Sequence, residues 1–284
     1  MSVKTAKKIA ERIHEFIEQC EAWSPKVFFT LLGEPLLNPN FVLIAAIFRK
    51  ALPQSQFVLI SNGDLFQKYK NPYEEIFASV DIIVADAYTE SAKEQIIRYG
   101  KEHNIPVENF YTEWAPKKKS PFTDHKRKIQ NVICLMEDIA THDKESSTRK
   151  INNFGGNAPI QKKPLLLKKS CFTPLREMSI RYDGLVPLCC LDVGNEFILG
   201  NLIEQSIEDI WFQPALESAR RLLRKGQRGF SPCCYCDARL PSTFFSVESA
   251  TLDAPSAKDY RNIRSHFDQI QKIKTKNGRD RWVC

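Results

Sequence analysis

The first half of the chain combines two hydrophobic patterns. Apolar residues recur at helical spacing in three stretches and form compact runs in four others, so the first pattern predicts amphipathic helices and the second buried strands. The expected helices are residues 4–21, 41–50 and 91–100, and the expected strands are residues 26–32, 56–60, 80–85 and 105–110. Because strands that alternate with helices favour parallel pairing through right-handed crossovers, we expect a parallel α/β sheet here.

The second half contains an alternating pattern. Met178, Ile180 and Tyr182 alternate with polar residues, which predicts a half-buried strand. Asp183-Gly184 follows and indicates a type I′ hairpin turn, because glycine accepts the positive φ that this turn requires. Residues 185–191 are expected to return as the second strand of the hairpin.

Helix signals follow this hairpin. Ser206, with Asp209 three residues later, predicts a helix that begins with a capping box. Pro214 suits the first turn of a second helix, and Gly226 suits its C-terminal end. Apolar residues at helical spacing over residues 260–273 predict a further helix near the C-terminus.

Composition is that of an ordinary globular protein. The 284 residues are 43% hydrophobic and 26% charged, which is enough for one large or two modest domains. No run of eighteen apolar residues occurs, and the N-terminal residues form a charged amphipathic stretch instead of a signal peptide. We therefore expect a soluble, cytoplasmic protein that has no membrane partner.

Net charge is +7, and the basic residues gather in short runs. The runs cover residues 117–119, 125–128, 162–163, 168–169 and 220–225. Aromatic residues do not interleave with them as they do in a platform that binds single-stranded nucleic acid. This pattern favours solvated faces over nucleic-acid binding, with attraction to an acidic substrate as the alternative.

Cysteines give the clearest chemical signal. Six of the nine lie in one stretch, as Cys171, Cys189, Cys190, Cys233, Cys234 and Cys236. The expected hairpin holds the first near the second, and the helices that follow can deliver the last pair to the same point. An odd cysteine count and the absence of a signal peptide disfavour disulfides and favour a metal site.

Four thiolates bind either an iron-sulfur cluster or zinc, and their spacing alone permits both. Cys190 can take the place of Cys189, and Cys234 that of Cys233, but only Cys233 has the x2 spacing to Cys236. We therefore interpret Cys190 and Cys234 as small buried apolar residues, with contact to the metal ligands as the alternative.

Several segments of this half, in this order, resemble the SPASM/Twitch auxiliary-cluster domain of radical SAM enzymes. They are Cys171-Phe172-Thr173-Pro174, Ser179 to Gly184, Pro187 to Asp192, Leu199-Gly200-Asn201, Ser206 to Trp211 and Cys233-x-x-Cys236. The resemblance implies a 4Fe-4S cluster with Cys171, Cys189, Cys233 and Cys236 at the ligand positions. Because no cysteine follows Cys236 until Cys284, the single-cluster Twitch form is the better match. Four cysteine ligands imply electron transfer rather than direct binding of substrate to iron.

The resemblance extends to the first half. Gly33-Glu34-Pro35 and Ser61-Asn62-Gly63 follow two expected strands, where parallel sheets bind their ligands. They look like the Gly-Glu-Pro and Thr-Asn-Gly segments of the radical SAM barrel, which implies S-adenosylmethionine as a cofactor. Gly33, Glu34, Pro35, Ser61 and Asn62 match the family's binding segments. Residues 152–157 resemble the Gly-Gly segment that precedes the auxiliary domain in related enzymes.

One family motif has no match in the sequence. Radical SAM enzymes hold their catalytic cluster with Cys-x3-Cys-x2-Cys, and neither Cys20 nor Cys134 has partners at this spacing. The resemblance therefore implies an N-terminally truncated relative with an incomplete TIM-like barrel. Cleavage of S-adenosylmethionine by this chain alone is not expected, and no catalytic residue is assigned.

Three domains follow from these interpretations. The partial barrel is expected at residues 1–165, an α+β SPASM/Twitch iron-sulfur domain at residues 166–245, and a C-terminal helix and tail at residues 246–284. The resemblance implies a peptide or small metabolite as substrate and an electron donor such as a flavodoxin or ferredoxin. The alternative function is a zinc-binding four-cysteine interaction module without a redox role.

Overall fold

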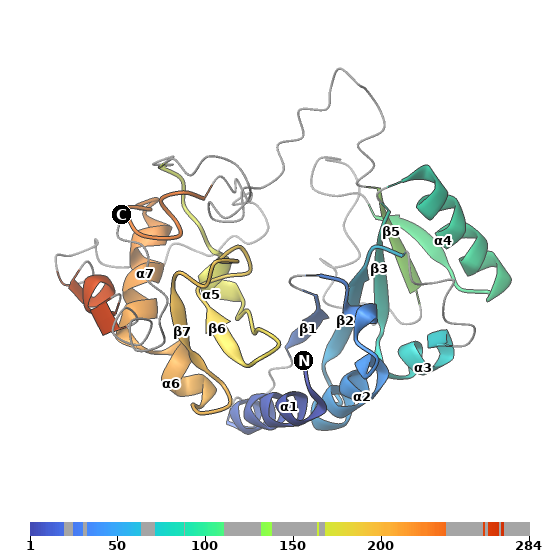
Figure 1. Ribbon diagram of the computed structural model, residues 1–284, viewed down its shortest axis with the longest axis horizontal. Helices are drawn as coiled ribbons and strands as arrows, with labels where there is room; N and C mark the ends of the chain where they lie inside the picture. Colours follow the sequence, from blue (N-terminus) through green and yellow to red (C-terminus); the bar gives the residue numbers. More distant parts are fainter. Residues whose placement is uncertain are drawn as a thin grey trace, which may run out of the picture. The chain divides into compact units, whose positions relative to one another are not determined.

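The computed structural model divides the chain into two compact units, residues 1–150 and residues 151–284 (Figure 1). It describes residues 1–19, 25–30, 33–63, 72–87, 89–110, 132–137, 164, 168–236, 258, 261–266 and 268–269. Residues 152–157, Cys20 and Cys284, on which the sequence raised expectations, lie outside the described residues. Each unit has its own secondary structure and its own buried residues.

A five-stranded parallel sheet forms the centre of the first unit, in the order β1-β2-β3-β5-β4. The strands are β1 (Lys26–Phe29), β2 (Gln56–Ser61), β3 (Ile82–Ala87), β4 (Val107–Phe110) and β5 (Val132–Glu137). Every residue of β3 is buried, as expected for a central parallel strand that is covered on both faces. The register places Phe29 beside Leu59 and Ser61 beside Ala85, so the carboxyl ends of the first three strands meet at one edge.

Four α-helices and one 3-10 helix accompany this sheet (Figure 1). They are α1 (Val3–Glu18), η1 (Pro35–Leu37), α2 (Phe41–Ala51), α3 (Pro72–Ser79) and α4 (Glu90–Glu102). Ser2 and Thr89 cap α1 and α4, since each hydroxyl accepts a hydrogen bond from the backbone N–H three residues later. The helices predicted at residues 4–21, 41–50 and 91–100 are therefore confirmed.

The two faces of the sheet differ. Leu59, Ile83 and Leu135 belong to a core that also contains residues of α2, α3 and α4, so these helices cover one face. Val58, Val84 and Cys134 belong to a separate buried cluster that consists of strand residues. A sheet with helices on one face and an apolar opposite face has the layering of a barrel wall. The described residues form no closed barrel, and the predicted α/β partial-barrel fold is confirmed.

Strand β5 is the main departure from the sequence prediction. The hydrophobic pattern predicts no strand at this position, yet β5 pairs with both β3 and β4 and lies between them. The strand order is therefore not the consecutive order of a simple barrel. Burial of Cys134 on this strand raises the pKa of its thiol to about 12, as is typical of an inert core cysteine.

The second unit is a small α+β arrangement around a two-stranded antiparallel sheet. Its elements are α5 (Thr173–Arg176), β6 (Leu185–Pro187), β7 (Ile198–Asn201), α6 (Ile207–Trp211) and α7 (Pro214–Arg224). The capping box of Ser206 and Asp209, the start of α7 at Pro214 and its end before Gly226 are as predicted. Residues 261–266 are helical, and His266 contacts the Ile198 carbonyl of β7 at 2.8 Å.

The predicted hairpin is partly wrong. Gly184 has φ +87° and ends a tight turn, in which its N–H donates to the Arg181 carbonyl. The turn is not type I′, because Asp183 keeps a negative φ. Residues 178–182 form no strand, and β6 pairs instead with β7, which comes later in the chain. Consequently Cys189 and Cys190 lie in the turn after β6 and not on the strand itself.

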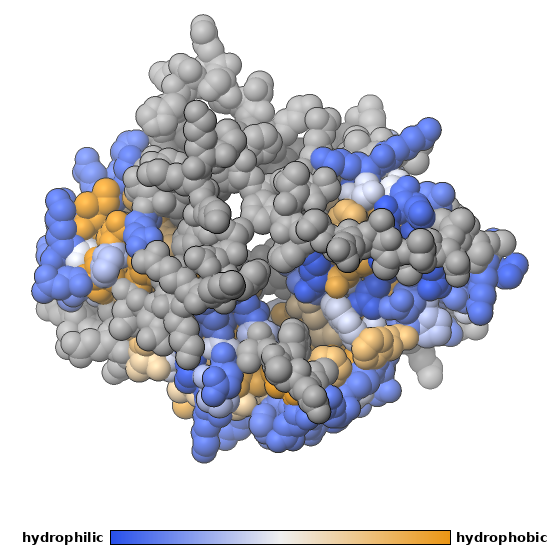
Figure 2. Space-filling view, turned by 180° about the vertical axis from the view of Figure 1, so that it is seen from behind, coloured by the Kyte–Doolittle hydropathy of each residue, from blue (hydrophilic) through white to orange (hydrophobic). Residues whose placement is uncertain are grey.

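Hydrophilic side chains dominate the described surface in the view of Figure 2, with smaller hydrophobic areas between them. The exposed large apolar side chains are Phe28, Leu37, Leu43, Tyr182, Ile203 and Phe212. Among the helices that the structure describes, none is both long and apolar enough to cross a membrane.

Candidate metal centre

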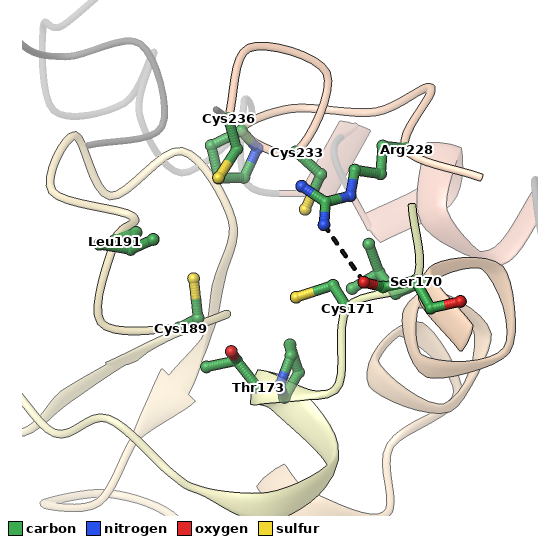
Figure 3. A pocket seen from close by; sticks show the side chains of 11 residues that line it. Ser170, Cys171, Thr173, Cys189, Leu191, Arg228, Cys233 and Cys236 are labelled. Carbon is green, nitrogen blue, oxygen red and sulfur yellow. Dashed lines mark hydrogen bonds between the residues drawn. The ribbon is translucent and has the colours of Figure 1, made fainter. Parts of the chain in front are cut away.

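The four cysteines that match the SPASM ligand positions line one pocket of the second unit. Cys171, Cys189, Cys233 and Cys236 come from three separate segments and surround the pocket, with their sulfurs directed toward its interior (Figure 3). The remaining walls are mainly apolar, with Ser170, Thr173 and Arg228 as polar exceptions. The further lining residues are Pro174, Leu191, Leu223 and Pro232. The fold therefore unites residues that are 65 positions apart in the sequence.

The first ligand position is anchored to the end of α7. The Cys171 N–H donates to the Leu223 carbonyl at 2.9 Å, and the Ser170 hydroxyl donates to the Arg224 carbonyl at 2.8 Å. These two carbonyls belong to the last turn of α7, where backbone carbonyls have no N–H donor within the helix. Segment 168–171 thus supplies the donors that the helix end lacks, and this contact fixes Cys171 over the pocket.

The backbone at Lys168 approaches the end of α7 so closely that position 226 requires a glycine. Gly226 has φ +72°, and a Cβ atom on it would lie 3.1 Å from the Lys168 carbonyl carbon. An L-residue would therefore combine a left-handed backbone with a tight contact. The glycine that ends α7 also lets the chain turn toward Cys233 and Cys236.

The loop after β6 positions Cys189. Asp192 is completely buried, and its carboxylate accepts hydrogen bonds from the N–H groups of Glu196 at 2.8 Å and Phe197 at 2.9 Å. Its own N–H donates to the Cys189 carbonyl at 3.1 Å, and its carbonyl accepts from the Arg181 guanidinium at 2.6 Å. One buried residue therefore organises the backbone on both sides of the turn.

Short turns arrange the last two ligand positions. The Tyr235 N–H donates to the Pro232 carbonyl at 3.1 Å, and the Cys236 N–H donates to the Cys233 carbonyl at 3.3 Å. The x2 spacing in such turns brings both thiols to the same side, as Figure 3 shows for Cys233 and Cys236.

The two additional cysteines do not line the pocket. Cys190 directs its thiol to Glu177, at 3.9 Å between Sγ and the carboxylate oxygen, and Cys234 is buried. Burial, together with the Glu177 charge, raises the pKa of Cys190 to about 12. Of the two registers that the sequence left open, the pocket therefore contains Cys189 and Cys233 and not their neighbours.

Electrostatics in the pocket favour a bound cation. Burial first, and neighbouring thiols second, raise the pKa values of Cys189 and Cys233 well above the ordinary value. Thiolates at these two positions are therefore unfavourable without positive charge nearby. Metal ions reverse this preference and deprotonate the thiols that bind them, so the donor set fits a metal centre.

The strand ends of the first unit also converge as expected. Glu34 accepts a hydrogen bond from the Leu36 N–H at 3.1 Å with one carboxylate oxygen and from the Asn62 N–H at 2.9 Å with the other. The Ser61 hydroxyl accepts from the Gly63 N–H at 3.2 Å, and Gly33 has φ +85°. Glu34 therefore joins the Gly33-Glu34-Pro35 segment directly to Asn62.

Sequence reasoning did not identify Arg228 as a pocket residue. It lies in an unremarkable polar stretch before Phe230, and its contacts are with backbone carbonyls of a segment almost 60 residues earlier. No local pattern encodes such a contact. Arg220, one of the basic run that was interpreted as a solvated face, is also buried, and its guanidinium lies 4.0 Å from the Trp211 ring centroid.

Comparisons with known proteins agree with this geometry. The family model SPASM, an iron-sulfur cluster-binding domain, matches residues 171–237. The S-adenosyl-L-methionine-dependent 2-deoxy-scyllo-inosamine dehydrogenase of Niallia circulans is 25% identical over 213 residues, which are 74% of this chain and 71% of that protein. Residues 171–237 thus form an iron-sulfur cluster-binding segment of the SPASM class.

Solved structures extend the likeness to the whole fold. BtrN in complex with AdoMet and 2-DOIA matches with a TM-score of 0.58 and 19% identity, over 86% of this chain and 83% of that one. BtrN in an open conformation matches with a TM-score of 0.54 and 16% identity, over 92% and 85%. The chain is therefore similar to radical SAM/SPASM proteins, in its cluster-binding segment by sequence and in the rest of its length by fold.

Proposed function

We propose that this chain binds one 4Fe-4S cluster through Cys171, Cys189, Cys233 and Cys236 and transfers electrons through it. The observation that carries the proposal is the shared pocket of these four cysteines, in the domain that matches the iron-sulfur family model. Because all four irons of such a cluster would then have a cysteine ligand, none is left open for a substrate. Electron transfer is the role that such a closed site supports.

Geometry favours a cluster over a single zinc ion. Tetrahedral zinc with Zn–S bonds of about 2.3 Å requires sulfurs roughly 3.8 Å apart. Among the residues that the structure describes, no group of three or more His, Cys, Asp or Glu side chains is placed to hold one metal ion. Four sulfurs that surround a pocket, yet are not gathered closely enough for one ion, suit a centre that contains several irons.

The test is anaerobic reconstitution of the full chain with iron and sulfide. We expect brown protein with about four irons per chain and an electron paramagnetic resonance signal after reduction. Colourless protein that retains one zinc and no iron would contradict the proposal and show that the chain is instead a zinc-binding interaction module.

The reaction that we propose for this system is an S-adenosylmethionine-dependent oxidation of a small molecule. The matched relative is an S-adenosyl-L-methionine-dependent dehydrogenase, which favours a metabolite over a peptide. Such an oxidation removes two electrons and two protons. An adenosyl radical, formed outside these residues, would take one hydrogen atom, and the cluster would accept the remaining electron as the second proton leaves and pass it to a one-electron carrier. The sequence contains no Cys-x3-Cys-x2-Cys, so we assign electron transfer and not radical generation to these residues.

The strand ends of the first unit are the proposed S-adenosylmethionine site. Glu34→Ala removes the acceptor of two backbone N–H groups and separates the Gly33-Glu34-Pro35 segment from Asn62. We expect about tenfold weaker binding of S-adenosylmethionine, measured by calorimetry. Glu34→Gln, which retains one acceptor oxygen, should lose less, and Glu90→Ala, which removes an exposed carboxylate of α4, should lose nothing. Equal affinity in Glu34→Ala and the wild type would reject this site.

The proposed partner is an acidic electron carrier such as a flavodoxin or ferredoxin, in the cytoplasm. Lys168, Lys169 and Lys225 are exposed, and they lie next to pocket residues Ser170 and Cys171 in segments that touch one another. Opposite charge accelerates such encounters and makes their rate fall with salt. The double variant Lys168→Glu/Lys169→Glu should slow reduction by reduced flavodoxin, whereas Lys101→Glu on α4 should not. If the rate of reduction by flavodoxin changes neither with salt concentration nor with these substitutions, docking at this surface is excluded.

A further inference from the structure

Arg228 brings a buried positive charge into the cysteine pocket. Its side chain is 5% exposed and lines the same cavity as the four cysteines (Figure 3). Lysine residues near the pocket are exposed to water, but this guanidinium is screened from it. A buried charge interacts more strongly with its neighbours than a surface charge does, because water and salt screen it less.

The same side chain holds the backbone that leads into Cys171. Its Nε–H donates to the Lys169 carbonyl at 2.9 Å, and one terminal NH2 group donates to the Ser170 carbonyl at 3.4 Å. A planar guanidinium suits two acceptors in fixed positions, whereas a lysine ammonium is a flexible point charge. Arg228 therefore holds the backbone next to the first ligand position through its hydrogen bonds, and it contributes a positive charge to the pocket.

The positive charge of Arg228 lies close to the cysteine sulfurs of the pocket. Figure 3 places the guanidinium beside Cys233, and both side chains line the same pocket. A positive group that favours a thiolate also favours each further negative charge in the pocket. Reduction of a thiolate-bound cluster adds one negative charge, and net charge and hydrogen bonds around the sulfurs set the reduction potential of such clusters.

We propose that Arg228 is a positioning residue that holds the backbone before Cys171 through its hydrogen bonds and raises the reduction potential of the cluster through its buried charge. This inference rests on the proposed cluster function. It goes further in assigning to one side chain, outside the cysteine motif, the control of how readily the centre accepts an electron.

The experiment compares the midpoint potentials of the reconstituted wild type, Arg228→Gln, Arg228→Lys and Lys225→Gln, by a redox titration followed by electron paramagnetic resonance. Arg228→Gln should reduce the equilibrium constant for reduction by tenfold or more, which is a shift of about 59 mV to lower potential for one electron. Arg228→Lys retains the charge and should keep most of the potential, although it loses the two-acceptor geometry. Lys225→Gln removes an exposed charge nearby and should leave the potential unchanged.

Every outcome either supports or contradicts the proposed role of Arg228. Loss of iron in Arg228→Gln but not in Arg228→Lys supports the need for the charge, because the two variants share the loss of the guanidinium fork. Loss of iron in both, or unchanged potentials in both, overturns the electrostatic part and leaves Arg228 as a backbone anchor only. A wild type that holds no reducible cluster refutes the proposed function itself, which separates that failure from failure of this inference.

Discussion

Cys236→Ala is expected to abolish cluster binding. The variant removes one of the four pocket sulfurs and lies in the turn that also presents Cys233, so iron content should fall from about four per chain toward zero. Because metal binding and folding are coupled in thiolate sites, the segment from Cys171 onward should also become sensitive to protease. Iron analysis and limited proteolysis of the anaerobically purified protein provide the measurement.

Cys234→Ala is the matched control for this prediction. Cys234 is only two residues away and is buried, but it does not line the pocket. Its substitution should cost little beyond the packing of a small side chain and should leave the iron content unchanged. The reverse result, with iron lost in Cys234→Ala and kept in Cys236→Ala, would mean that the ligand register is wrong.

Asp192→Ala is expected to destabilise the second unit by about 3 kcal/mol, because it leaves one buried and one part-buried backbone N–H group without their acceptor. These are the N–H groups of Glu196 and Phe197, and the Asp192 side chain is inaccessible to water. The unfolding temperature should fall by roughly 10 °C in a calorimetric scan. The loop that carries Cys189 should loosen with it, so cluster retention in air should shorten.

Asp192→Asn separates these contributions. Its amide oxygen can accept one of the two hydrogen bonds, so about half of the loss of stability is expected. Asp209→Asn, in the exposed capping box of α6, should change the unfolding temperature far less. If Asp192→Ala unfolds at the wild-type temperature, the buried carboxylate does not organise this loop.

The sequence determined the features that depend on neighbours along the chain. The capping box at Ser206, the start of α7 at Pro214 and the stop at Gly226 were all readable, because each acts on hydrogen bonds or backbone angles within one helical turn. The alternation of helices and strands likewise predicted a parallel sheet with one edge that collects Glu34 and Asn62. The cysteine spacing indicated a metal site and left open which metal it binds.

Long-range pairing was beyond the sequence pattern. Residues 178–182 alternate like a strand, but their neighbourhood provides no partner strand, and β6 takes β7 instead. Strand β5 has an apolar run too short to distinguish from a loop, and its place between β3 and β4 depends on contacts with residues about 25 and 50 positions away. In both cases the hydrogen bonds that define the strand come from distant residues.

The same distinction applies to the candidate site. The sequence alone specified that thiols gather between residues 171 and 236, and it carried the resemblance to an iron-sulfur domain. Only the tertiary structure decided that Cys189, and not Cys190, faces the pocket, and that Arg228 lies there with it. The direction of a side chain and the neighbours of a buried charge depend on which distant segments pack against them. Local sequence propensities do not encode that packing.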